Sequence, residues 1–245
     1  MKDASATAIY GSRAANGVVI ITTKNGRSGR EGKFEFTTNI SQSSPANEFD
    51  LFNASEYRAQ QLAITGNPVP SFDDAGGDTD WQDVITRGAL SIDNNLAYSK
   101  NYGNGNIRGT FSYTNQQGVI ENSSQERITG RINAAHRFFD EKLAVNLQLS
   151  ASRVNDEAPQ ISGQSGASGN LIGAAYSAPP TWPNDPNFFV AGNRLNPRNI
   201  LDNFLGEGQT TRYLLNGSLE YSFTNELSAK VNLGCLLYTS DAADD

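Results

Sequence analysis

Few residues of this 245-residue chain have the types and spacing that catalysis needs. There is one histidine, His136, and one cysteine, Cys235, and no Ser-His-Asp or Cys-His set can be assembled around them. His136 follows Ile132 and Ala134 at a spacing of two, so we expect a structural side chain in a strand. A catalytic zinc ion would lack ligands. The sequence therefore predicts a protein that is not an enzyme and needs no cofactor.

Ligand binding by a loop is better supported by the residue types. Between residues 155 and 210, aromatic side chains stand among several prolines. Because proline stiffens a loop, the rings could present fixed faces that stack on sugars, while nearby amide and carboxylate groups hydrogen-bond hydroxyls. The alternative is that the rings only pack the loop against its neighbours. The candidate ligand-binding residues are Trp182, Asn184, Asp185, Phe188 and Phe189.

An acidic stretch lies in a second long loop, between residues 41 and 89. Its carboxylates are Asp73, Asp74, Asp78 and Asp80. Oxygen ligands from a flexible loop can gather a calcium ion, whereas such a run is more often only solvated. The sequence therefore predicts no metal site, with calcium at this stretch as the alternative.

Composition and charge exclude several classes of protein. The formal net charge is −7, from 19 Lys and Arg against 26 Asp and Glu. Because no basic cluster with interleaved aromatic residues appears, we expect no nucleic-acid partner. No apolar run approaches the ~18 residues that a transmembrane helix needs.

Strict alternation of apolar and polar residues is the main structural signal. In Leu143–Ala151, leucine, valine and alanine alternate with alanine, asparagine, glutamine and serine, which is the period of a strand with one apolar face. The sequence predicts seven such strands and an all-β, antiparallel fold. They are Phe34–Ile40, Leu90–Tyr98, Ile107–Thr114, Ile128–Phe138, Leu143–Ala151, Tyr213–Phe223 and Leu227–Leu233.

The connections at one end of these strands are short, and those at the other end are long. Tight turns are expected at "NYGNGN", "FDEK" and "TNE", whereas 41–89 and 155–210 are long. Short turns on one rim and long loops on the other are typical of an outer-membrane β-barrel. Aromatic residues beside the short turns suit the interface of such a membrane. These residues are Tyr98, Tyr102, Phe138, Phe139, Tyr221 and Phe223.

The barrel hypothesis assigns opposite environments to the two faces of the strands. It predicts an inner, polar face and an outer face in contact with membrane lipid. The alternative is a soluble all-β binding or adhesion module, in which the apolar face forms an ordinary core. The inner residues are expected to include Arg108, Arg131, Asn133 and Gln148, and the outer ones Ile107, Ile132 and Leu147.

The start of the chain carries a specific resemblance. Residues 2–26 read "KDASATAIYGSRAANGVVIITTKNG". Residues that favour a short helix are followed there by a β-branched run at 18–21. This stretch resembles the closing segment of the plug domain in the SusC/RagA family of TonB-linked outer-membrane proteins. Further stretches resemble the start of the family's barrel in the same order. They are "LFNASEYRAQQL", "TDWQDVITRGA", "FSYTNQQGVIENSSQERITGRIN" and "APPTWPNDPN".

This resemblance implies both a fold and a function. The family's fold is a plugged transmembrane barrel of ~22 strands, of which this chain is expected to be a fragment with about seven strands, preceded by the last helix and strand of the plug. The function implied is import of glycans or peptides across the cell outer membrane. The partners implied are outer-membrane lipid, a SusD-like surface lipoprotein, and the TonB complex through an N-terminal part that this sequence lacks.

The resemblance also predicts the domain boundaries. Residues 1–31 are expected to end the plug domain and residues 32–234 to begin the barrel. The last stretch, "CLLYTSDAADD" at 235–245, resembles a translated sequencing adapter, so we expect residues 235–245 to be a non-native tail.

Overall fold

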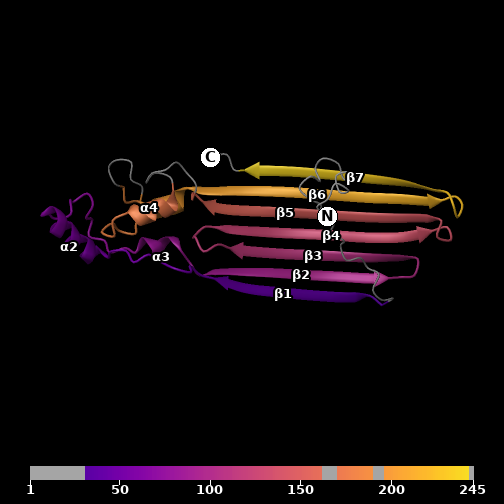
Figure 1. The fold of residues 1–245 in the computed structure, drawn as a ribbon, viewed down its shortest axis with the longest axis horizontal. Helices are drawn as coiled ribbons and strands as arrows, with labels where there is room; N and C mark the ends of the chain where they lie inside the picture. The colour runs from indigo at the N-terminus through magenta and orange to yellow at the C-terminus, as the bar shows by residue number, and fades with distance from the viewer. Residues whose placement is uncertain (1–30, 162–169, 190–195, 243–245) are drawn as a thin grey trace, which may run out of the picture.

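Seven antiparallel strands form one sheet in which each strand pairs with its neighbours in the sequence (Figure 1). The computed structural model describes residues 31–161, 170–189 and 196–242. The predicted plug end at 1–31 therefore lies almost entirely outside the described residues. The strands are β1 (Lys33–Ser43), β2 (Ala89–Asn101), β3 (Gly105–Gln117), β4 (Ser124–Phe138), β5 (Leu143–Pro159), β6 (Leu205–Ser222) and β7 (Ser228–Ala242).

All seven predicted strands are confirmed, but most extend further than predicted. β5 continues past Ala151 through the polar stretch Ser152–Pro159, which pairs with Leu205–Arg212 of β6. The hydrophobic alternation fades there while the backbone ladder continues, because ladder hydrogen bonds do not depend on side-chain polarity. Periodicity therefore locates the apolar band of each strand and underestimates the strand itself.

The predicted asymmetry of the connections is also confirmed. Turns at 102–104, 139–142 and 223–227 lie at one end of the sheet, called here the short-turn end. The connections 44–88, 118–123 and 160–204 lie at the other, the long-loop end, where Figure 1 shows the helices beyond the strands. Gly103 takes φ 88° in the first short turn, a left-handed conformation that glycine adopts without strain.

One continuous register carries the two predicted faces across the sheet. Arg108 lies opposite Asn133, which lies opposite Gln148, and Thr110 lies opposite Arg131. Because directly opposed residues project to the same side, Arg108, Arg131, Asn133 and Gln148 share the polar face. Their neighbours along each strand form the apolar face, and the inner and outer residue sets predicted from the sequence are thus separated as expected. Members of the apolar face include Phe34, Phe36, Leu96, Ile107, Phe111, Ile132, Leu147, Leu149, Leu215 and Leu219.

Neither face of the described sheet is covered by a packed core. The buried apolar residues of the described chain lie mainly in the long connections, and the few in strands are small, such as Ala89 and Ala97 of β2. On the apolar face, Phe34 is 71% exposed and Ile40 is 68% exposed. A soluble sandwich buries its apolar face against a second sheet. This sheet presents it outward.

Four short helices complete the described chain, all within the long connections. They are α2 (Ala54–Thr65), α3 (Trp81–Ile85), α4 (Leu171–Ser177) and α5 (Pro197–Asn203). In the described ranges, no helix has the length and apolar character required to cross a membrane.

Strand β7 runs through most of the predicted non-native tail. Residues up to Ala242 pair with β6 without a break at Cys235. Leucine, tyrosine and threonine in this stretch favour a strand wherever a neighbouring edge is free. However, Leu236 and Tyr238 lie opposite Leu214 and Arg212 on the polar face, so the alternation of the preceding strands is not kept. The origin of residues 235–245 stays a prediction.

A pair of lysine substitutions on adjacent β5 residues distinguishes the faces. In the complete protein, Leu147→Lys should impair assembly into bilayers, because a lysine on a lipid face near the midplane costs ~2–4 kcal/mol. Gln148→Lys should assemble normally, because its side chain projects from the polar face. The heat-modifiable mobility shift of the folded barrel in outer-membrane fractions measures both, and equal assembly would contradict the assignment of faces.

Candidate functional site

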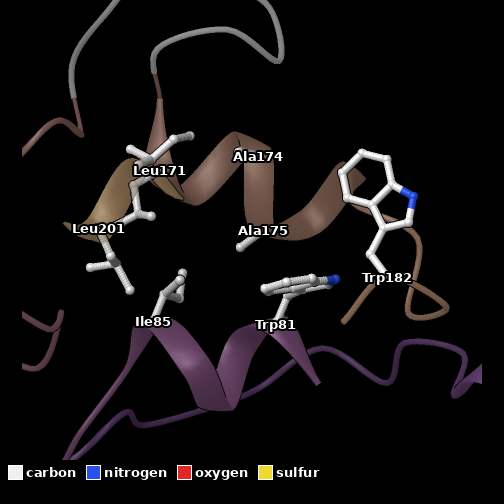
Figure 2. Close-up of a cluster of buried hydrophobic side chains, with 8 residues drawn as sticks. Trp81, Ile85, Leu171, Ala174, Ala175, Trp182 and Leu201 are labelled. Atoms are coloured by element: carbon white, nitrogen blue, oxygen red, sulfur yellow. The ribbon is translucent and has the colours of Figure 1, made fainter. Parts of the chain in front are cut away.

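The long connections fold into a small cluster with its own apolar core, called here the loop cluster. Figure 2 shows Trp81 and Ile85 of α3 facing α4, with Trp182 to one side and Leu201 to the other. Partly buried side chains, including Ile120 from the β3–β4 connection, pack against this core. Its buried members are Trp81, Ile85, Leu171, Ala174, Ala175, Trp182, Ile200 and Leu201.

Two segments about a hundred residues apart are joined by backbone hydrogen bonds within the loop cluster. The amides of Ala75 and Gly77 both donate to the carbonyl of Thr181, at 3.2 and 2.9 Å, and the Thr79 amide donates to Pro180 at 2.8 Å. Side chains add to this ladder, since the Thr79 hydroxyl donates to the Trp182 carbonyl at 2.7 Å. A Cβ at Gly77 would collide with the Trp182 backbone, so the close approach requires glycine there.

The two tryptophans anchor this contact from opposite sides. Trp81 donates its indole N–H to the Pro179 carbonyl at 3.0 Å and is buried. Trp182 is 1% exposed, and its ring centre lies 5.9 Å from that of Phe188. In this arrangement Trp182 is buried and Phe188 packs against the core of the loop cluster, and the ligand-binding role of both residues stays a prediction.

The other candidate ligand-binding residues lie on the surface of the same segment. Asn184 and Asp185 are exposed, and Phe189 is 75% exposed. The candidate residues predicted from the sequence are thus of two kinds: buried or half-buried aromatic residues, and exposed polar or aromatic residues. Whether the exposed ones touch a ligand stays a prediction.

Two buried asparagines that the sequence analysis did not single out fix the backbone of this segment. Asn196 donates its side-chain amide to the Asp185 carbonyl at 2.7 Å, and Asn199 donates to Pro186 at 2.9 Å. Asn196 also caps α5 by accepting from the Arg198 amide at 2.9 Å. An asparagine followed by proline is a recognisable helix start, so the cap was predictable, whereas the contact with Asp185 was not.

The acidic stretch is divided among separate protein partners. Asp74 pairs with Arg58, Asp78 accepts from the Ala54 amide at 3.0 Å, and Asp80 caps α3 by accepting from the Gln82 amide at 2.9 Å. Within the ranges that the structure describes, no three acidic, histidine or cysteine side chains are placed to hold a metal. The calcium alternative at Asp73, Asp74, Asp78 and Asp80 stays untested.

An ion pair attaches α2 to the acidic stretch. The Arg58 guanidinium makes a bidentate contact with the Asp74 carboxylate. Nε donates to Oδ2 and Nη2 donates to Oδ1, each at 2.7 Å. This hydrogen-bonded guanidinium, aided by the Gly76 amide, lowers the pKa of the Asp74 carboxyl to about 2. α2 itself begins with a capping box formed by Asn53 and Glu56 and ends at Gly66 in a left-handed conformation.

A cleft of about 430 Å³ opens between the two long connections. Phe52 and Tyr57 lie along one side, Tyr176 and Ser177 along the other, and Asp78 reaches it from the acidic stretch. Aromatic faces beside carboxylate and hydroxyl groups can stack on and hydrogen-bond a polar ligand with apolar faces. This cleft, with the exposed residues Asn184, Asp185 and Phe189, is the candidate functional site.

His136 lies far from that site, at the short-turn end. Its ring centre is 5.6 Å from that of Tyr102 and 4.1 Å from that of Phe138, on the apolar face of β4. The histidine is thus a packed member of the aromatic group predicted at this rim, which agrees with the structural role expected from the sequence.

Comparisons with known proteins give the class of protein that this sheet belongs to. No family model matches the chain. It is 36% identical to the TonB-dependent receptor SusC of Bacteroides thetaiotaomicron over 78% of this chain and 19% of SusC. It is 32% identical to the TonB-dependent receptor P3 of Formosa agariphila over 96% of this chain and 24% of that receptor.

Solved structures agree on the fold. The RagAB peptide transporter matches with a TM-score of 0.80 at 20% identity, over 98% of this chain and 32% of that chain. The RagAB peptide importer in an open-open state matches with a TM-score of 0.79, also at 20% identity, over 98% of this chain and 31% of that chain. The predicted fold class, an antiparallel β-barrel fragment of seven strands, is therefore confirmed.

These matches confirm the resemblance to SusC/RagA-family TonB-dependent receptors that the sequence predicted. The chain spans about a fifth to a quarter of the length of the curated relatives that it matches.

The Arg58–Asp74 pair predicts an acid-sensitive attachment of α2. A carboxyl whose pKa is lowered in the folded state stabilises that state at pH values above its unfolded pKa of ~3.9. This stabilisation is lost as the pH falls toward the folded pKa of about 2. Amide hydrogen exchange of 54–65 in the complete receptor, corrected for intrinsic rates, should thus show protection that is constant from pH 7 to 5 and falls below pH 4. Asp74→Asn should reduce the protection already at pH 7 and lessen this acid dependence; unchanged protection in that variant would contradict the role of the pair.

Proposed function

We propose that the complete receptor containing this sequence is an outer-membrane transporter that imports glycans or peptides together with a SusD-like surface lipoprotein, driven by the TonB complex. The observation that carries this proposal is a seven-stranded sheet with an exposed apolar face and a polar opposite face. Transport rather than catalysis agrees with the names of the relatives, which are receptors. In this proposal residues 1–31 end the plug and 32–234 begin the barrel wall.

The same sheet supports a location in the outer membrane. A barrel that spans a membrane satisfies its backbone between strands and turns apolar side chains to lipid. The aromatic group at the short-turn end, with Tyr102 and Phe138, suits the periplasmic interface. The loop cluster then faces the outside of the cell.

A protein partner at the loop cluster is supported by its exposed apolar side chains. α2 buries only Ala54, and several large apolar residues near it are open to solvent. Such patches are typical of protein–protein contacts. The solved neighbours are two-component by name, RagAB, which agrees with a lipoprotein partner here. The exposed residues are Leu51, Phe52, Leu62, Ile64 and Phe72.

The substrate would meet the loop cluster before it enters the barrel. The cleft beside Tyr176 and the exposed group of Asn184, Asp185 and Phe189 provide aromatic and hydrogen-bonding contacts. Both sugars and peptides use such contacts. We assign Trp182 and Phe188 an indirect part, since they hold this segment in place.

Uptake assays test the function and the site together. A strain that lacks the receptor gene should lose uptake of either fluorescent oligosaccharides or fluorescent oligopeptides, and the wild-type gene should restore it. Phe189→Ala should assemble normally and lower uptake about tenfold, because the substrate loses one stacking contact and is held less firmly in position. The matched control is Phe139→Ala, because Phe139 is exposed to a similar degree at the opposite rim, and its uptake should match wild type.

Two results would contradict the proposal. Undiminished uptake of both substrate classes after deletion would remove the transport function. Recovery of the complete protein as a stable monomer in buffer without detergent would favour the soluble binding module instead.

A further inference from the structure

The centre of the polar face carries more positive than negative charge. Three adjacent cross-strand rows pass through Arg108, Arg131 and Arg212, and they also contain Lys33 and Glu35. The remaining members of these rows between β1 and β7 are uncharged. Four cations therefore face one carboxylate, in a chain whose formal net charge is −7.

The single carboxylate in these rows is already shared by two cations. Glu35 lies 2.9 Å from the Lys33 ammonium and 3.4 Å from the Arg108 guanidinium. Arg212 lies 5.5 Å from the centre of the Tyr238 ring. Arg131 forms no ion pair with any residue in the described ranges, although it lies in the same row as Glu35.

The unpaired Arg131 guanidinium borders a hollow in the polar face. A concavity of about 420 Å³ is lined by Arg108 and Arg131 together with the amide side chains of Asn133, Gln148 and Asn216. A guanidinium offers paired N–H donors that match the two oxygens of a carboxylate, and amide side chains add further donors. No acidic residue of the described ranges lines the hollow.

We infer that this hollow, centred on Arg131, is a binding site for a carboxylate group. The inference rests on the proposed function to the extent that a closed barrel wall encloses the polar face. Enclosure lowers the local dielectric, so an unpaired guanidinium there is costly and a bound carboxylate is correspondingly favoured. Arg108 contributes a second cation that Glu35 neutralises only in part.

Two sources can supply this carboxylate. One is an acidic side chain elsewhere in the receptor's own polypeptide, enclosed by the barrel. The other is an acidic substrate that passes along the wall. The chemistry of the contact is the same in both cases.

Carbodiimide cross-linking of the complete receptor tests the inference. Arg131→Lys places a primary amine at the hollow, and carbodiimide joins an amine to a carboxylate only when the two are in contact. Gln148→Lys places an amine in the same hollow from the neighbouring strand, which keeps the test valid if one variant fails to assemble. The control is Arg127→Lys, on the same face of β4 but outside the hollow, where the Arg127 guanidinium donates to Gln125.

Arg131→Lys and Gln148→Lys should each give a cross-linked peptide in about tenfold higher yield than the control. The yield rises with the fraction of receptors in which a carboxylate occupies the hollow through a charge-assisted contact. A cross-link in receptor without substrate, mapped by mass spectrometry, assigns the carboxylate to the receptor's own chain. A cross-link that forms only with added hexaglutamate assigns it to the substrate. If neither condition gives a cross-link above the control, the inference is overturned. Because the cross-link is measured in purified receptor, this outcome does not depend on whether transport is observed.

Discussion

The structure depends on one uninterrupted antiparallel register across seven strands. Side chains alternate with a period of two, so a slip of a single residue between any two strands would move every later apolar side chain to the polar side. No such slip occurs from β1 to β7. The register therefore converts a local sequence pattern into two faces of opposite chemistry, one suited to lipid and one to water or an enclosed polypeptide.

The register also determines where the function can reside. Because consecutive strands pair, all short turns fall at one end and all long connections at the other, and the long ones meet above a common rim. There the hydrogen bonds between Gly77, Thr79 and the Pro180–Thr181 backbone fasten two loops that the sequence separates by about a hundred residues. The candidate cleft lies beside this contact, because Thr79 and Pro180 line it together with Phe52, Tyr57 and Tyr176.

The strands and their faces were predictable because each is encoded locally, as in Leu143–Ala151, where every second residue is apolar. The interior of the loop cluster was not. Trp182 was placed among candidate ligand contacts because an aromatic residue beside prolines has the same local pattern whether it is buried or exposed. Its burial depends on Gly77 and on Trp81 of α3, both of which are distant from it in the sequence. The division of the acidic stretch among Arg58, the Ala54 amide and α3 is likewise a tertiary fact.

If this sheet is a barrel wall with its apolar face in lipid, spin labels along β5 should alternate between lipid and water. Nitroxides attached one at a time to positions 143–151 of the complete receptor in bilayers would be exposed to oxygen, which concentrates in lipid, and to a water-soluble nickel complex. We expect a period of two, with oxygen collisions highest at Val145, Leu147 and Leu149, and nickel collisions highest at Asn146, Gln148 and Ser150. The opposite phase, or no alternation, would contradict it.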